Sequence, residues 1–480
     1  MSYAFAAFVA LSAAIGLSNW RFAVYLAFVI ALIRDPVRKM TPGEPLWITY
    51  IGAAVWAGIF VGCFGSSRAV RTRILKSFPG IRKSIVLLVL AILPAAGISL
   101  VLYSNGWIFA AVGLVSYLAP IPCAFVGVQL ARTPRGFLRV CSFFVLVNAL
   151  GLIGGLAEFL GWAWPGLGGL NNFNWVRQQH GVWVDMVGGF FRSPDVGGFY
   201  AAHVLSISLL LAIPRRKNGA PVLPWLLMVA WGAFHVFIAG RRKMMAIPIV
   251  FVACMLILAF RRKKGSFLGT IALFGTALAA VGITGWLFVS GNEELKDHTI
   301  YASTAFDDII PKLYGHTFQG SIETVRQSGI LGSGLGVATQ GAHYGGQQRQ
   351  TRAWQEDGVS RLFKELGVPG VLLVFLAALQ LGREVIRCLG IAIPSSLENR
   401  QTLSDASLSM VVANLACFVI SHQHISGDPL NAMIPLLFFG AFFGHVYYAR
   451  EELQRSSPPP RPLVTNVPPL VSSAFDGTRS

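Results

Sequence analysis

The sequence predicts an all-α, polytopic membrane protein of about 12 (11–13) transmembrane helices with a large, partly helical extracytoplasmic loop. Three observations predict this fold class. The 480 residues are 54% hydrophobic but only 12% charged, whereas soluble domains carry roughly 25% charged residues. Apolar runs near the length of about 20 residues that crosses a bilayer recur along the chain. Short basic clusters separate alternate runs, as the positive-inside rule describes. A soluble globular protein is therefore excluded.

Ten apolar runs follow one another from residue 84 onward. The basic clusters at 68–83, 132–135, 215–217, 261–264, 383–387 and 450–455 define the cytoplasmic side by the positive-inside rule. The segments 161–198 and 290–367 are then long extracytoplasmic loops. The predicted spans are residues 84–103, 108–130, 137–160, 199–213, 221–239, 245–260, 267–289, 368–381, 408–420 and 430–448.

The first 66 residues allow two arrangements. The apolar stretches 4–17, 22–33 and 46–64 cross separately, or the first two form one broken span, which gives twelve crossings in total. We favour the broken span. It places Arg34, Arg38 and Lys39 outside, although the positive-inside rule alone counts them as cytoplasmic. Residues 1–455 are predicted to form the membrane domain, and the Pro- and Ser-rich residues 456–480 a disordered cytoplasmic tail.

The net charge of +18 results from 39 Lys and Arg against 21 Asp and Glu. A nucleic-acid partner would require these cations on one continuous face, but they occur as short clusters between apolar runs. We therefore predict no nucleic-acid partner and interpret most of the basicity as an insertion signal. The six cysteines have no Cys-x-x-Cys spacing, so neither a disulfide framework nor a metal site is predicted. No cofactor is predicted.

Two basic segments on the predicted outer side depart from this pattern. Arg192 belongs to Arg-Ser-Pro-Asp195-Val-Gly-Gly, directly before a span. Its guanidinium offers a planar fork of donors suited to a diphosphate; the alternative is an arginine that reaches to lipid headgroups. Asp195 is placed to cap the next helix. The second segment, Gly-Arg241-Arg242-Lys243, indicates an anion site, unless a re-entrant stretch keeps it cytoplasmic.

The 290–367 loop contains candidate catalytic residues. Glu356 and Arg361 would share one side of a helix. A carboxylate near a cation stays ionised and can act as a general base; the alternative is a first-turn acid of a helix. His343 is a second candidate base, although a lone histidine in a loop is more often only solvated. Gly334 and Gly336 follow no predicted strand, which excludes a dinucleotide-binding motif.

In this order and topology the motifs resemble the O-antigen ligase/polymerase superfamily of bacterial envelope glycosyltransferases. The resemblance covers residues 190–370 and includes the Arg192 motif, Arg241 at the outer end of a span, the glycines up to Gly336, and Glu365-Leu-Gly-Val-Pro-Gly before a span. It implies a GT-C-like enzyme that transfers a glycan from undecaprenyl diphosphate to a hydroxyl, with inversion and without a metal.

The resemblance also implies roles for individual residues. Arg192 and Arg241, helped by Arg242 or Arg361, would hold the diphosphate. Either Glu356 or His343 would act as the base, and Asp195, Gly334 and Gly336 would have structural roles. Ligases of the family carry a His-Asn pair where this chain has Glu356-Asp357. This departure shifts the expectation from a lipid A ligase toward a polysaccharide polymerase or a separate ligase-like branch of the family.

The expected location is the bacterial inner membrane, with the active site facing the periplasm. The expected partners are an undecaprenyl-diphosphate-linked glycan, a glycan or glycolipid acceptor, membrane lipid and other envelope-polysaccharide assembly proteins. A transporter or flippase of lipid-linked oligosaccharide is the alternative. A transporter should carry charges deep within several spans and show repeat symmetry, whereas this sequence keeps its charges in loops.

Overall fold

A computed structural model describes residues 1–170, 175–179, 182–217, 219–262, 275, 293–303, 313–339, 357–391, 393–422, 428 and 430–456. Three sequence predictions lie outside these residues: the span 267–289, the disorder of residues 457–480, and the placement of His343 and Glu356.

Helices make up most of the described chain. Eight are long and apolar enough to cross a membrane, which confirms a helical, polytopic membrane protein; the total of about 12 (11–13) stays a prediction. The eight are Trp47–Ser66, Pro79–Leu102, Gly106–Leu130, Pro134–Phe159, Pro194–Ile213, Arg242–Arg261, Gly358–Leu389 and Glu398–Ile420. Two shorter apolar helices, α1 (Ser2–Ser18) and α11 (Leu223–Ile238), lie beside them.

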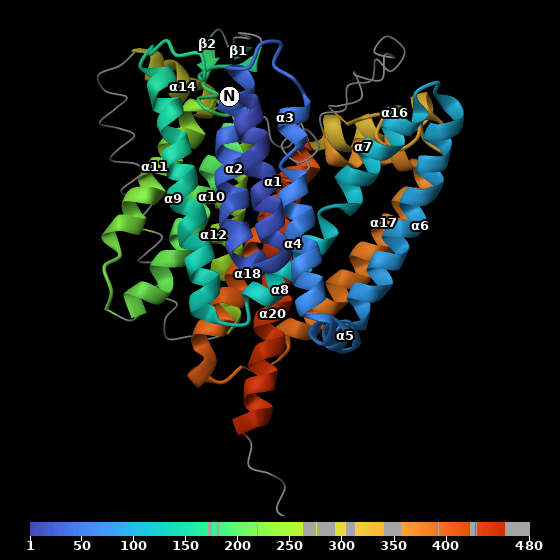
Figure 1. The fold of residues 1–480 in the computed structure, drawn as a ribbon, viewed down its shortest axis with the longest axis vertical. Helices are drawn as coiled ribbons and strands as arrows, with labels where there is room; N and C mark the ends of the chain where they lie inside the picture. Colours follow the sequence, from blue (N-terminus) through green and yellow to red (C-terminus); the bar gives the residue numbers. More distant parts are fainter. Residues whose placement is uncertain are drawn as a thin grey trace, which may run out of the picture.

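The helices of the bundle run roughly side by side (Figure 1). They are α2 (Trp20–Lys39), α4 (Ala53–Ser66), α6 (Pro79–Leu102), α7 (Gly106–Leu118), α8 (Ile121–Leu130), α9 (Pro134–Phe159), α10 (Pro194–Lys217), α12 (Arg242–Arg261), α17 (Gly358–Leu389), α18 (Glu398–Ile420) and α20 (Met433–Ser456). The shorter elements are α3 (Trp47–Tyr50), α5 (Arg68–Ser77), α14 (Glu293–Ser303), a π-helical segment (Leu313–Gln319), α16 (Gly320–Ser328) and a 3-10 turn (Ser395–Leu397).

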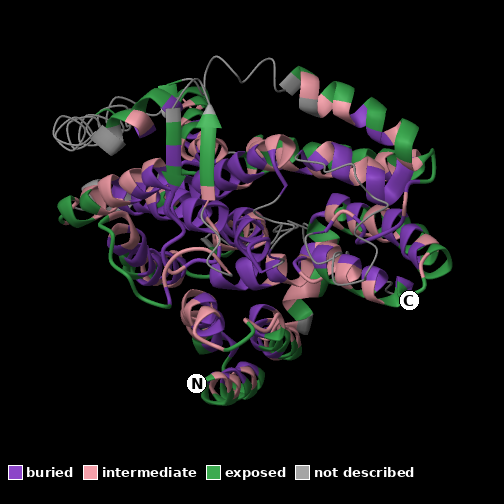
Figure 2. Cartoon of the chain, turned by 90° about the horizontal axis from the view of Figure 1, so that it is seen from above, coloured by how far each residue is buried: buried purple, intermediate pink, exposed green. Residues whose placement is uncertain are grey.

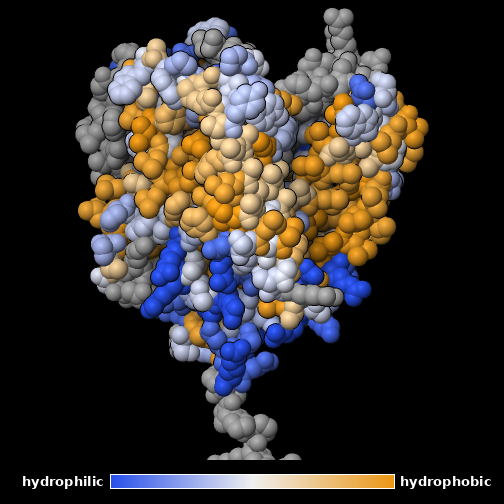
Figure 3. All heavy atoms as spheres, viewed as in Figure 1, coloured by the Kyte–Doolittle hydropathy of each residue, from blue (hydrophilic) through white to orange (hydrophobic). Residues whose placement is uncertain are grey.

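The two ends of the bundle differ in composition. One end carries the strands, α14, α16 and the N-terminus, and we call it the hairpin end (Figure 1). The opposite end carries α5, with the sequence RAVRTRILKS, and the last turns of α20; we call it the basic end. Figure 3 shows, on the face in view, an apolar band across the middle of the molecule and strongly hydrophilic residues directly below it, at the basic end.

The core of the bundle surrounds α10. In the apolar 18-residue stretch of Pro194–Ile213, 94% of the residues are buried, against 28% in that of Pro79–Leu102 in α6. Seen from above, buried positions gather in the middle of the bundle (Figure 2). Because α10 packs against α9, α11 and α12, its first turn is held by several helices at once.

The N-terminal region differs from the arrangement we favoured. Helices α1 and α2 are joined only by Asn19, whose side chain accepts a hydrogen bond from Phe22 N–H at 3.2 Å and so caps α2. The two helices pack against each other and both pack against α4. They therefore form an antiparallel pair, and the prediction of one broken span is wrong.

A two-stranded sheet is the exception to the predicted all-α fold. Strands β1 (Trp175–Gln179) and β2 (Val182–Met186) pair antiparallel, with Trp175 opposite Met186. The sequence contains a signal for strand β2, because the apolar residues Val182, Val184 and Met186 alternate with Trp183 and Asp185. The hairpin lies between α9 and α10, within the predicted 161–198 loop.

Some helix boundaries also differ from the prediction. Helix α18 begins at Glu398, ahead of the predicted 408, because polar residues of its first turns are buried by neighbouring helices. Helix α17 begins at Gly358, but Gly367 has φ 67° and ψ −178°, so the helix is interrupted there. The predicted span from residue 368 corresponds to the second part of α17.

Glycines bring α1 and α4 into direct backbone contact. A Cβ atom on Gly58 would collide with the Ala13 carbonyl oxygen, and one on Gly62 would collide with that of Gly16. Gly58 and Gly62 are four residues apart on one side of α4, the spacing with which membrane helices approach closely.

We expect Gly62→Ala to destabilise the protein by about 1–3 kcal/mol, because the added methyl group overpacks the α1–α4 contact. The apparent melting midpoint of the purified protein in detergent measures this. Gly65→Ala is the matched control, since a Cβ there has no neighbour within 4 Å and alanine favours helix. Equal melting midpoints for the two variants would contradict close α1–α4 packing.

Candidate functional site

Arg192 lies in a buried ionic network at the hairpin end. Its Nη2 is 3.4 Å from Oδ2 of Asp428, and its backbone N–H donates to Oδ2 of Asp35 at 3.1 Å. Arg34, near the end of α2, pairs with both carboxylate oxygens of Asp428. Arg34 and Asp428 are fully buried. The segment before α10 is therefore attached to α2 and to the residues before α20.

Arg241 joins the same region through Asp195. Its Nη2 is 3.0 Å from Oδ2 of Asp195, and Lys243 Nζ is 2.8 Å from Oδ1. Lys243 also donates to Ser421 Oγ at 2.8 Å. Asp195 lies in the first turn of α10, three residues after Arg192, and binds these cations through its side chain. Both arginines predicted from the sequence are thus tied to the start of α10, Arg192 by preceding it directly in the chain and Arg241 through its ion pair with Asp195.

These contacts define the arginine–aspartate cluster. It contains four cations and three carboxylates, so it carries one excess positive charge. Burial lowers the pKa of the Arg192 guanidinium, and the nearby Arg34 cation lowers it further, while Asp35 raises it. An added anion would offset both unfavourable effects. The members are Arg34, Asp35, Arg192, Asp195, Arg241, Lys243 and Asp428.

Arg241 has donor capacity left within the cluster. The side chain is only 5% exposed, and its Nε–H has no acceptor among the described residues. Its guanidinium lies 5.1 Å from the ring centre of Trp175 in β1, and Arg242 lies 4.5 Å from that of Tyr301 in α14. Because a buried unpaired donor is costly, this arginine suits an anionic oxygen.

Residues 34–39 complete the surroundings of the cluster. Lys39 donates to the carbonyl oxygens of Gly189 at 2.8 Å and Phe191 at 2.7 Å, and so holds the chain just before Arg192. Arg38 donates to Glu44 O at 2.9 Å. These cations lie at the hairpin end with Arg192. The positive-inside rule alone predicts that these residues lie on the same side as the basic loops, and that prediction is therefore wrong.

Arg361 belongs to a second buried cluster. It lies on α17, with Nε 3.5 Å from Glu365 Oε1, and it donates to Ser116 and Thr339. Glu365 also accepts hydrogen bonds from Tyr117 OH at 2.7 Å and from Ala338 N–H at 3.0 Å. These partners hold α7, α17 and the 336–339 segment together, so we leave Arg361 out of the anion site.

The glycine-rich segment forms a strap across three helices. Gly334 and Gly336 have φ of +100° and +82°, which disfavours other residues. A Cβ on Gly334 would collide with Ser99 of α6, and one on Gly336 with Phe109 O of α7. The strap also reaches α17, where Val368 N–H donates to Ile330 O at 2.8 Å. The glycines therefore serve close backbone packing.

The start of α17 approaches the arginine–aspartate cluster through α18. The Asp357 side chain caps α17 by accepting a hydrogen bond from Ser360 N–H at 2.7 Å, and burial raises the pKa of its carboxyl. A Cβ on Gly358 would collide with Phe418 of α18. The same end of α18 contains Ser421, which accepts from Lys243. Glu356 precedes Asp357 in the sequence, outside the described residues.

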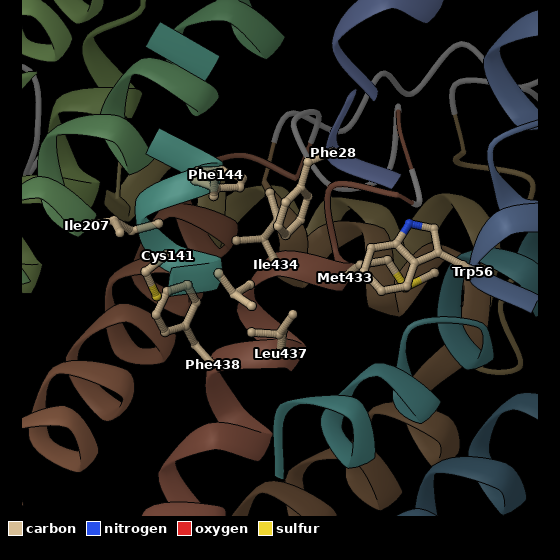
Figure 4. A pocket seen from close by; sticks show the side chains of 10 residues that line it. Phe28, Trp56, Cys141, Phe144, Ile207, Met433, Ile434, Leu437 and Phe438 are labelled. Atoms are coloured by element: carbon tan, nitrogen blue, oxygen red, sulfur yellow. The ribbon is translucent and has the colours of Figure 1, made fainter. Parts of the chain in front are cut away.

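A small apolar cavity lies away from both clusters. It has about 20 Å³ of free space and is lined by apolar side chains of α2, α4, α9, α10 and α20, among them Phe28, Trp56, Phe144 and Phe438 (Figure 4). Without a charged lining group it offers no acid, base or anion ligand. Within the described part of the chain, no three His, Cys, Asp or Glu residues lie together as metal ligands.

Sequence reasoning missed Arg34, Asp35 and Asp428 as site residues. The available signal was that Arg34, Arg38 and Lys39 violated the positive-inside rule if α2 crossed the membrane. Asp428 had no comparable signal, because it reaches the cluster only when residues nearly 400 positions apart come together.

Fold and site together define a helical membrane protein with a buried cationic site at one end of its bundle. Comparison with family models, with curated proteins and with solved structures found no match.

We expect Asp428→Asn to destabilise the protein by about 3–5 kcal/mol, because it removes a carboxylate shared by two buried arginines. The apparent melting midpoint in detergent is again the measurement. Glu323→Gln is the control, since the pair of Glu323 with Arg326 is exposed and such pairs contribute about 0–1 kcal/mol. In a double-mutant cycle with Arg34→Gln, additive losses would contradict the Arg34–Asp428 pairing.

Proposed function

We propose that the protein is an inverting, metal-independent glycosyltransferase that moves a glycan from undecaprenyl diphosphate to a sugar hydroxyl, as an O-antigen or exopolysaccharide polymerase or ligase. One observation carries the proposal: Arg192 and Arg241 lie in buried ion-pair networks at the start of α10, at one end of a membrane bundle, and these networks together hold four cations against three carboxylates. A lipid-linked diphosphate is an anion presented at this level of a membrane. The motif resemblance supports the transfer chemistry.

The distribution of charge supports an orientation. The positive-inside rule assigns the basic end, with α5 and the end of α20, to the cytoplasm. The hairpin end then faces the outside, which is the periplasm in the proposed bacterial inner membrane. Arg34, Arg38 and Lys39 act against this rule, but each has polar partners within the protein.

The proposed reaction uses fixed cations. Arg192 and Arg241 neutralise the donor diphosphate and the negative charge that grows on it in the transition state. Asp428 and Asp195 hold the two guanidinium groups in place. Glu356, or else His343, takes the proton of the acceptor hydroxyl. The hydroxyl oxygen attacks the anomeric carbon from the face opposite the phosphate, and undecaprenyl diphosphate departs with the electrons of the broken carbon–oxygen bond.

A transporter or flippase of the same lipid-linked sugars is the second candidate. Arg34 and Asp35 are buried within α2, and ionisable residues inside spanning helices are typical of transport pathways. Both residues lie in the last two turns of α2 and contact the cluster at the hairpin end. This position favours a surface site over a path through the bilayer.

We expect Arg192→Ala, Arg241→Ala and Glu356→Ala each to lower glycan transfer, because each removes charge stabilisation or the base. The loss expected for an arginine is about 10²–10³-fold. The measurement is the lipid-linked glycan of a gene-deletion strain complemented with each variant at matched membrane abundance. If His343 is the base, His343→Ala rather than Glu356→Ala abolishes transfer.

The matched control for the arginines is Arg326→Ala, since Arg326 is 75% exposed on α16. In the deletion strain, short undecaprenyl-linked units accumulating outside the membrane support the enzyme. Accumulation on the cytoplasmic side supports the flippase. Full complementation by Arg192→Ala, Arg241→Ala, Glu356→Ala and His343→Ala would contradict the proposed mechanism.

A further inference from the structure

A pocket at the basic end has the chemistry of an anion site. It has about 260 Å³ of free space between α5, the turn after α8, the first turn of α18 and the end of α20. Four arginines and two glutamates contribute to its wall together with two tyrosines. These residues, with Val70, define the cationic pocket: Arg73, Arg132, Arg400, Arg455, Tyr447, Tyr448, Glu451 and Glu452.

Two of the four arginines in the cationic pocket form ion pairs, and the other two do not within the described part of the chain. Arg400 is buried and occupied, because it pairs with Glu452 and donates to the carbonyl oxygens of Ala131 and Arg132, both at 3.0 Å. Arg455 pairs with Glu451 at 2.8 Å. Arg73 and Arg132 have no ion pair within the described part of the chain. The pocket therefore presents two positive charges that are unpaired among the described residues, those of Arg73 and Arg132, beside the paired Arg400 and Arg455.

An apolar cavity adjoins the cationic pocket on the side of the membrane. It has about 80 Å³ of free space between α5, α6, α8, α17 and α20, and all its lining residues except Ser84 are apolar. The two spaces share three elements. Ile74 follows Arg73 on α5, Val128 lies one turn before Arg132, and Phe443 lies one turn before Tyr447.

This order of polar and apolar space matches one kind of ligand. The cationic pocket is formed by α5 and the end of α20, which lie at the basic end (Figure 1). Figure 3 shows hydrophilic residues at this end, below the apolar band, where a bilayer has its headgroups. The apolar cavity is lined by residues farther along α8 and α20 from this end, toward the hydrocarbon. A soluble phosphate would use only the cationic pocket. A ligand that fills both carries an anionic group at the interface and a hydrocarbon chain above it.

We propose that this paired site binds an anionic glycerophospholipid of the leaflet at the basic end, with its phosphate between Arg73 and Arg132 and the start of one acyl chain in the apolar cavity. Basic pockets between membrane helices on the cytoplasmic side suit such headgroups. The proposal is independent of the glycosyltransferase proposal, because the site lies at the opposite end of the bundle from Arg192 and Arg241.

The test is lipid binding to the purified full-length protein, measured by native mass spectrometry and by thermal stabilisation in detergent. Phosphatidylglycerol is the anionic probe, phosphatidylcholine the neutral lipid, and inorganic phosphate the probe for a free anion. We expect phosphatidylglycerol to bind in preference to both. In the double variant Arg73→Gln/Arg132→Gln its affinity should fall by about 30-fold, which is about 2 kcal/mol.

Matched variants separate the site from general surface charge. Arg71→Gln is the control, because Arg71 lies on α5 at the same end but does not line the pocket. Leu88→Trp narrows the apolar cavity and should weaken phosphatidylglycerol binding while both arginines remain. The melting midpoint without lipid verifies that each variant is folded.

Four outcomes would overturn the proposal. Equal binding of phosphatidylcholine would remove the role of charge. Inorganic phosphate that binds as tightly as phosphatidylglycerol would make this a site for free anions. Unchanged lipid affinity in Arg73→Gln/Arg132→Gln, or the same loss in Arg71→Gln, would show that the lipid binds elsewhere.

Discussion

The pairing of Arg34 with Asp428 is the contact on which the hairpin end depends. It joins α2 to the segment before α20, and Asp428 also faces Arg192. The cost of desolvation offsets much of the attraction in a buried ion pair, so the pair adds little net stability. Its main effect is that a fold in which either charge is buried without its partner is strongly unfavourable. The N-terminus of α10, with Asp195 and its cations, is therefore held in one position relative to α2.

Local signals in the sequence predict much of this arrangement, and long-range pairing accounts for the rest. Apolar length and basic clusters predict most spans, and the positions of Arg192 and Arg241 against the charge rule predict that both lie at one end. The carboxylates that hold them could not be predicted, since their pairing depends on tertiary packing. The interruption of α17 at Gly367 has a local cause and follows from the Gly-Val-Pro-Gly sequence.

Glycines allow the backbones of neighbouring helices to lie in direct contact at more than one place in the bundle. The α1–α4 contact uses Gly58 and Gly62, and the α8–α20 contact uses Gly127 and Gly440 in the same way. Lipid is as apolar as the helix surfaces, so burial alone does not drive helices together in a membrane, whereas contact between small residues does. The sequence shows these glycines, but their partner helices appear only in the fold.

The sequence separation within the arginine–aspartate cluster has a consequence for biogenesis. Arg34 and Asp428 are 394 positions apart, so the ribosome completes nearly the whole chain before the carboxylate exists. Until then, Arg34 and Arg192 have only Asp35 among their cluster carboxylates. The contact of Arg34 and Arg192 with Asp428 thus forms late in synthesis, and a chain truncated before residue 428 lacks the carboxylate that both arginines share.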